Sequence, residues 1–121
     1  MKKALIFFGI TVLIIAACSK TTGRGDNGPS AAPAIDCSTV TATFSADVNL
    51  IIQTRCSTNS GCHGDGSKNP PGPLLTYDQI FSSRIAIRYA VVSGDMPRGS
   101  KLSTIEIDAV ACWVSSGAPA N

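Results

Sequence analysis

The chain has 121 residues, of which 44% are hydrophobic and 15% are charged, and its formal net charge is +2. Two of the ten basic residues, Lys2 and Lys3, lie in an N-terminal export signal, so eight basic residues face eight acidic residues in the remainder. This balance, without a basic stripe, argues against nucleic acid as a partner, and the length suits one small domain.

The N-terminal residues predict an exported protein with a lipid anchor. Lys2 and Lys3 precede an apolar run of fourteen residues, ALIFFGITVLIIAA, which is shorter than the about 20 residues of a membrane-spanning helix. The run ends in IAAC, which resembles a bacterial lipobox. The resemblance implies a signal peptide at residues 1–17 and a lipidated Cys18 as the first mature residue. The alternative is an ordinary secretory signal or a membrane anchor.

A flexible tether is expected between the lipid and the folded domain. Residues 18–36 are rich in Gly, Pro, Ser, Thr and Ala, and they have no apolar periodicity. The domain is therefore expected to cover residues 37–121. The implied location is the cell envelope, on the periplasmic side or at the outer-membrane surface.

The first predicted helix covers residues 44–55. Ser45 is the expected N-cap, and Val48, Ile51 and Ile52 recur at helical spacing on one face. This short amphipathic helix leads directly to a cysteine, Cys56.

The second predicted helix begins near Tyr77, because Thr76 and Gln79 have the spacing of a capping box. It is expected to end at Gly94. A break near Ser82 and Ser83 would divide it into two short helices.

The third predicted helix covers residues 104–116, and Ser103 and Glu106 form its capping box. Gly117 is its expected end. Its inward face is expected to hold Leu102, Ile105, Ala109, Cys112 and Trp113. No strand alternation is evident, so the predicted fold is all-α, with three or four short helices joined by long loops.

The loops hold the residues with distinctive chemistry. The stretch CSTNSGCHG begins at Cys56, and five residues separate this cysteine from Cys62, which His63 follows. Covalent haem attachment usually uses C-x-x-C-H, with two residues between the cysteines. His63 is the only histidine of the mature chain, and Met96 is its only methionine. Histidine and methionine together are axial ligands of haem iron in one class of cytochromes.

The order of these elements resembles the class I cytochrome c family over residues 44–118. The resemblance rests on the C…CHG element, on GDMPRG at residues 94–99, and on LSTIEIDAVACWVSSGA at residues 102–118. Within the family, the chain is similar to short lipoprotein domains of Bacteroidetes-type bacteria, which have a stretched C-x(n)-CH and a cysteine before the helix tryptophan. The implied fold is a small helical domain around haem c, and the implied activity is electron transfer without catalysis.

The resemblance assigns a role to each residue of the site. Cys56 and Cys62 would form thioethers with the haem, and His63 and Met96 would bind its iron. Trp113 and Leu102 would pack near the ring. The spacer departs from the family pattern, so three outcomes remain open: two thioethers, one thioether through Cys62, or a disulfide between the two cysteines without covalent haem.

The cysteine count also leaves alternatives open. With Cys18 assigned to lipid, four cysteines remain, and they allow three connectivities. Two structural disulfides are one interpretation; the other assigns Cys56 and Cys62 to haem and leaves Cys37 with Cys112. Both interpretations include a bridge between Cys37 and Cys112.

Two functions are therefore weighed. The first is a monomeric, membrane-anchored electron carrier with redox proteins as partners. The second is a haem-free, disulfide-stapled surface module that binds a partner protein or a glycan. A haem peroxidase and a zinc site at Cys56, Cys62 and His63 are less favoured, since no second histidine is present and zinc ligands are seldom adjacent in sequence.

Overall fold

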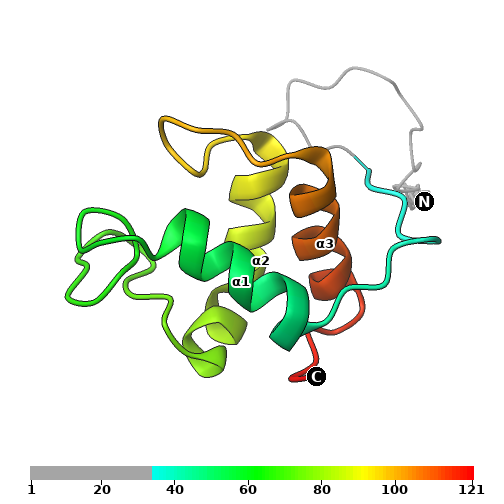
Figure 1. Ribbon diagram of the computed structural model, residues 1–121, viewed down its shortest axis with the longest axis horizontal. Coiled ribbons are helices and arrows are strands. Elements are labelled where there is room, and N and C mark those ends of the chain that lie inside the picture. The colour runs from blue at the N-terminus through cyan, green and yellow to red at the C-terminus, as the bar shows by residue number, and fades with distance from the viewer. Residues whose placement is uncertain (1–33) are drawn as a thin grey trace, which may run out of the picture.

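The structure is a computed structural model that describes residues 34–121. The predicted signal peptide, the lipidated Cys18 and most of the tether lie outside the described residues. Within residues 34–121 the structure is all-α, with no strand, as the sequence predicts. Figure 1 shows α2 and α3 side by side, with the first helix crossing them. Two long loops extend beyond the end of the first helix.

The first helix is continuous over residues 44–56. It consists of α1 (Asn49–Ile51) between two π-helical turns, η1 (Phe44–Val48) and η2 (Ile52–Cys56). The predicted apolar face is confirmed, because Val48, Ile51 and Ile52 are all buried. Cys56 is the last residue of this helix, so its position is fixed by helical backbone.

The predicted N-cap of the first helix is wrong by two residues. The cap is Thr43, not Ser45, and its hydroxyl accepts a hydrogen bond from the Ala46 backbone N–H at 3.2 Å. Asp47 completes the cap from within the helix, since its carboxylate accepts from the Thr43 backbone N–H at 2.8 Å. The Ser45 backbone N–H is instead bound by the carbonyl of the C-terminal residue, Asn121, at 2.8 Å. Both arrangements satisfy N–H groups that have no partner within the helix.

The second helix, α2 (Tyr77–Ser93), is continuous, so the alternative of a break near Ser82 and Ser83 does not hold. Its capping box is present as predicted: the Thr76 hydroxyl accepts from the Gln79 backbone N–H at 3.3 Å. The helix ends at Gly94, whose φ of 76° is left-handed and favours glycine.

The third helix, α3 (Thr104–Ser115), also has its predicted capping box at Ser103. The predicted inward face is wrong at Ile105, which is 81% exposed. The other predicted members of this face, Leu102, Ala109, Cys112 and Trp113, are buried. Val110 is also buried, and the partly buried Ile107 packs against the core. Two residues correspond to about 200° of helical rotation, so Ile105 points away from Ile107.

A disulfide joins Cys37 to Cys112 and links the segment before the first helix to α3, with the two Cα atoms 5.4 Å apart. Trp113, the residue after Cys112, is 1% exposed and is packed in the core. Its ring centroid is 5.7 Å from that of Phe44. The core thus joins the first helix to α3 beside the disulfide. No helix within residues 34–121 is long and apolar enough to span a bilayer.

Candidate functional site

Four of the predicted site residues, Cys56, Cys62, His63 and Met96, line one cavity of about 410 Å³. This volume lies within the range of about 300–1,000 Å³ that is typical of cofactor and ligand sites. Its walls come from the end of the first helix, from the loop that follows it, and from the loop between α2 and α3. The lining residues are Thr54, Arg55, Cys56, Thr58, Gly61, Cys62, His63, Asn69, Pro70, Met96, Pro97, Arg98 and Ser100.

The spacer between the two cysteines folds back on itself. The His63 backbone N–H donates to the Cys56 carbonyl at 2.9 Å, so the chain returns to the end of the helix it has just left. Cys62 and His63 therefore lie against the cavity together with Cys56. The three additional residues of the spacer do not separate the two cysteines into different sites.

His63 is held in one orientation by its neighbours. Its side-chain Nδ1 lies 3.1 Å from the Gly72 carbonyl oxygen, and its own carbonyl accepts from the Leu74 backbone N–H at 2.8 Å. A carbonyl oxygen only accepts, so Nδ1 is the nitrogen that carries the proton. In a neutral ring the lone pair is then on Nε2, so Nε2 is the nitrogen that could act as an acceptor or a ligand.

Met96 reaches the same cavity from the other long loop. The Met96 backbone N–H donates to the Ala90 carbonyl at 3.0 Å, which ties the loop to the last turns of α2. Just before it, the Asp95 carboxylate accepts from the Ser93 hydroxyl at 2.7 Å. The thioether of Met96 is thus placed by the end of α2, and it faces a cavity that His63 also lines.

The two cysteines at the cavity are free thiols, of which Cys56 is buried. Burial, together with smaller contributions from Cys62 and Glu106, raises the pKa of Cys56 to about 11. At neutral pH Cys56 is therefore a protonated thiol. A thiol attacks a disulfide only as its thiolate, so Cys56 is a slow partner for disulfide exchange.

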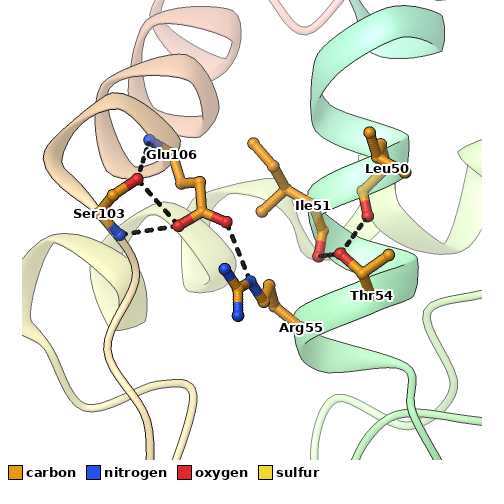
Figure 2. Close-up of polar contacts among 6 residues, drawn as sticks. All are labelled: Leu50, Ile51, Thr54, Arg55, Ser103 and Glu106. Carbon is orange, nitrogen blue, oxygen red and sulfur yellow. Dashed lines mark hydrogen bonds and ion pairs between the residues drawn. The ribbon is translucent and has the colours of Figure 1, made fainter.

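Two arginines line the cavity, and the sequence analysis did not single them out. Figure 2 shows Arg55, at the end of the first helix, reaching the Glu106 carboxylate of α3. The distance from Arg55 Nε to Glu106 Oε1 is 3.0 Å. The second arginine, Arg98, is exposed and forms no ion pair among residues 34–121. Arg98 could have been predicted at the cavity, because it lies only two residues after Met96 in the sequence.

Glu106 serves both the helix cap and the ion pair. Its second carboxylate oxygen accepts from the Ser103 backbone N–H at 2.7 Å and from the Ser103 hydroxyl at 2.9 Å. The backbone hydrogen bond from Ser103 is the main cause of the lowered pKa of Glu106, and Arg55 lowers it further. The charge of Arg55 is thus compensated, whereas Arg98 leaves its charge available at the cavity.

Two residues of the predicted site lie elsewhere. Trp113 and Leu102 are buried in the core and are not among the residues that line the cavity. The Trp113 indole N–H donates to the Pro119 carbonyl at 2.9 Å, which fixes the C-terminal segment. In the structure, these two side chains support the helices that carry the site.

Neither a search for metal-binding clusters nor the comparisons with known proteins identify the function of this cavity. Within the part of the chain that the structure describes, no three His, Cys, Asp or Glu side chains form a group that could hold a metal ion. In comparisons with known proteins, no family model, no curated protein and no solved structure matches the chain. The site must therefore be interpreted from its own geometry.

Proposed function

We propose that this protein is a c-type cytochrome domain that carries electrons. One observation carries the proposal: Met96 lies on a different segment of the chain from Cys56, Cys62 and His63, yet all four line one cavity. Two thiols, one imidazole and one thioether are the side chains that a covalently attached, His/Met-ligated haem requires. The resemblance to class I cytochromes c rests on the same residues.

The donor set supports electron transfer over catalysis. His63 offers Nε2 because the Gly72 carbonyl engages Nδ1, and Met96 offers a thioether that is uncharged at any pH. A haem bound by both would supply an iron that changes between the ferric and ferrous states. With both axial positions occupied by protein, no open coordination position remains for a substrate. The expected partners are therefore redox proteins.

The charge at the cavity also suits haem, which has two carboxylate groups. Arg55 and Arg98 line the cavity, and no Asp or Glu side chain does. Arg98 has no carboxylate partner in residues 34–121, so it is the better candidate to hold a haem carboxylate. The N-terminal lipobox adds a location for the carrier, on a membrane of the cell envelope.

A haem-free surface module is the second candidate, and one surface feature favours it. A more open hollow between the first helix and α3 has two exposed apolar residues, Leu50 at 60% and Ile105 at 81%. Such a surface suits a protein partner. This candidate pairs Cys56 with Cys62 in a disulfide, whereas the electron carrier uses at least one of the two cysteines as a thioether.

The proposal is tested by the absorbance of the mature protein produced with a c-type maturation system. A haem spectrum that survives denaturation and acid extraction is expected, and the double variant Cys56→Ser/Cys62→Ser should lose it. Replacement of Met96 by alanine should keep the covalent haem but change the reduced spectrum and lower the reduction potential. A colourless wild-type protein would refute the proposed function.

A further inference from the structure

The loop between the two cysteines has a fold of its own, centred on Asn59. The Asn59 carbonyl accepts hydrogen bonds from the backbone N–H groups of Cys62 at 3.0 Å and Gly64 at 2.9 Å. The side-chain Oδ1 of Asn59 accepts from the Gly61 N–H at 2.8 Å. Asn59 thus binds three N–H groups from the second half of the loop, which is the half that carries Cys62 and His63.

The close approach at this point requires glycine at position 64. A Cβ atom on Gly64 would lie 2.8 Å from the carbonyl carbon and oxygen of Asn59 and 2.9 Å from the Ser57 carbonyl oxygen. These contacts are with backbone, which has little room to move. The spacer is therefore packed tightly against the residues that follow the histidine.

A second asparagine holds the same loop from the opposite direction. The Asn69 side-chain amide donates to the carbonyls of Gly61 at 2.7 Å and Cys62 at 3.3 Å. The buried Ser67 hydroxyl also donates to the Cys62 carbonyl. The backbone carbonyl of Asn59 thus binds the N–H of Cys62, and the side chains of Asn69 and Ser67 bind the carbonyl of Cys62. Asn69 also lines the cavity itself.

We propose that Asn59 and Asn69 are positioning residues that make this expanded motif equivalent to the compact one, so that both cysteines attach to one haem. The inference rests on the proposed function. Cys56 is already placed by the last turn of the first helix, whereas Cys62 lies on a loop. In the compact motif, a spacer of only two residues restricts the position of the second cysteine. In this longer loop, the hydrogen bonds of the two asparagines restrict the position of Cys62.

The attachment step needs no electron donor or acceptor. Each cysteine thiol adds across a carbon–carbon double bond of a haem vinyl group, so that an S–H bond breaks, a C–S bond forms, and the proton ends on the neighbouring carbon. This chemistry needs both cysteines as thiols. In the structure both are free thiols.

The test compares single and double attachment in the full-length chain, produced with a c-type maturation system and purified from the membrane. Thiols that iodoacetamide alkylates in the denatured, haem-bearing protein report each cysteine without a thioether, and peptide mapping assigns them. The variants are Asn59→Ala, Asn69→Ala and their combination. Ser60→Ala is the matched control, because Ser60 lies in the same loop, is exposed and makes no side-chain hydrogen bond in residues 34–121. Asn59→Asp keeps the Oδ1 acceptor and should rescue the loop.

Wild type and Ser60→Ala should show no alkylated thiol at the site. Each alanine variant should raise the ratio of singly to doubly attached haem by about 5-fold, the effect of one neutral hydrogen bond. The free thiol should be Cys62 and not Cys56, because the side-chain hydrogen bonds that are lost hold Gly61 and Cys62, whereas Cys56 stays in the helix. General loss of folding would instead expose both cysteines equally, and that result would refute the positioning role.

The outcomes separate this inference from the proposed function. If haem is present in all variants and the combined variant keeps two thioethers, the positioning role is refuted and the cytochrome stands. A wild-type protein with a single thioether would also refute the positioning role and leave the proposed cytochrome function in place. If the wild type contains no haem, both proposals are refuted.

Discussion

At the scale of single residues, the two cysteines of the cavity have different environments, although they look equivalent in the sequence. Cys56 is fixed in helical backbone and buried, whereas Cys62 lies on a loop and is only partly buried. Burial raises the pKa of Cys56 to about 11. Its thiol is therefore ill suited to exchange with disulfides at neutral pH.

The Cys56 thiol should titrate late in the folded, haem-free protein. The thiolate is the form that reacts, so the rate of its alkylation should rise until about pH 11, whereas in unfolded protein it should level off near the ordinary pKa of 9.0. Between these two pH values only the unfolded state has lost the proton, so the free energy of unfolding should fall as the pH rises. Timed iodoacetamide labelling with peptide mapping measures the rate. A plateau below pH 9 in folded protein would contradict the raised pKa.

In the proposed cytochrome, Arg98 should raise the reduction potential of the haem. It is the cavity cation without an ion-pair partner among the described residues, and a positive charge favours the ferrous form, which has one positive charge less. Arg98→Gln should therefore lower the potential, as measured by redox titration at low salt. Arg88→Gln, on α2 and away from the cavity lining, is the matched control. Equal shifts of the reduction potential in the two variants would show that Arg98 has no specific effect on it.

At the scale of the helices, local capping was well predicted and helix phase was predicted less well. The capping boxes that begin at Thr76 and Ser103 were predictable because each is formed by two residues three positions apart, within one helical turn. The start at Thr43 was missed because Asp47 and the distant Asn121 complete that cap. The exposure of Ile105 was also missed, because spacing places it on the same face as Ala109 and Cys112, which are buried, and only tertiary packing decides that the first turn of α3 is left uncovered there.

The Ser103 cap should have a measurable effect on stability. Ser103→Ala removes the hydroxyl that accepts from the Glu106 backbone N–H at 3.3 Å, and the loss should lower the free energy of unfolding by about 1 kcal/mol. Urea unfolding followed by circular dichroism measures it. Thr104→Ala, at the neighbouring exposed hydroxyl, should change stability by less than about 0.5 kcal/mol. Equal effects of the two substitutions would show that the cap contributes nothing specific.

The candidate site was predictable as a set of residues but not as an arrangement. Cys56, Cys62, His63 and Met96 are distinctive by residue type and order, and the structure brings all four to one cavity. The supports could not be predicted in the same way. The Gly72 carbonyl that binds His63 is a backbone group, and such groups look alike in every sequence.

At the scale of the whole molecule, the Cys37–Cys112 disulfide compensates for a small core. It joins residues 75 positions apart and links the start of the domain to α3. Its removal in Cys37→Ser/Cys112→Ser should cost about 4 kcal/mol, because a long closed loop restricts the unfolded chain. Urea unfolding of the oxidised wild type and the double variant measures the difference. A change below about 1 kcal/mol would contradict this role.

The fold places rigid helix ends around a cavity made largely of loop. The first helix ends at Cys56, α2 ends shortly before Met96, and α3 contributes Glu106 to the ion pair with Arg55. Figure 1 shows the two long loops on the same side of the molecule, beyond the helices. Long loops in so small a domain generally have a function, and here they carry His63 and Met96.

The central claim is tested most directly by the intact mass of the mature polypeptide, produced from residue 19 behind an export signal together with a c-type maturation system. After denaturation, the account predicts the polypeptide mass plus one haem, less the two hydrogens of the Cys37–Cys112 disulfide. A polypeptide without porphyrin that lacks four hydrogens would instead have Cys56 paired with Cys62, and that mass would contradict the account.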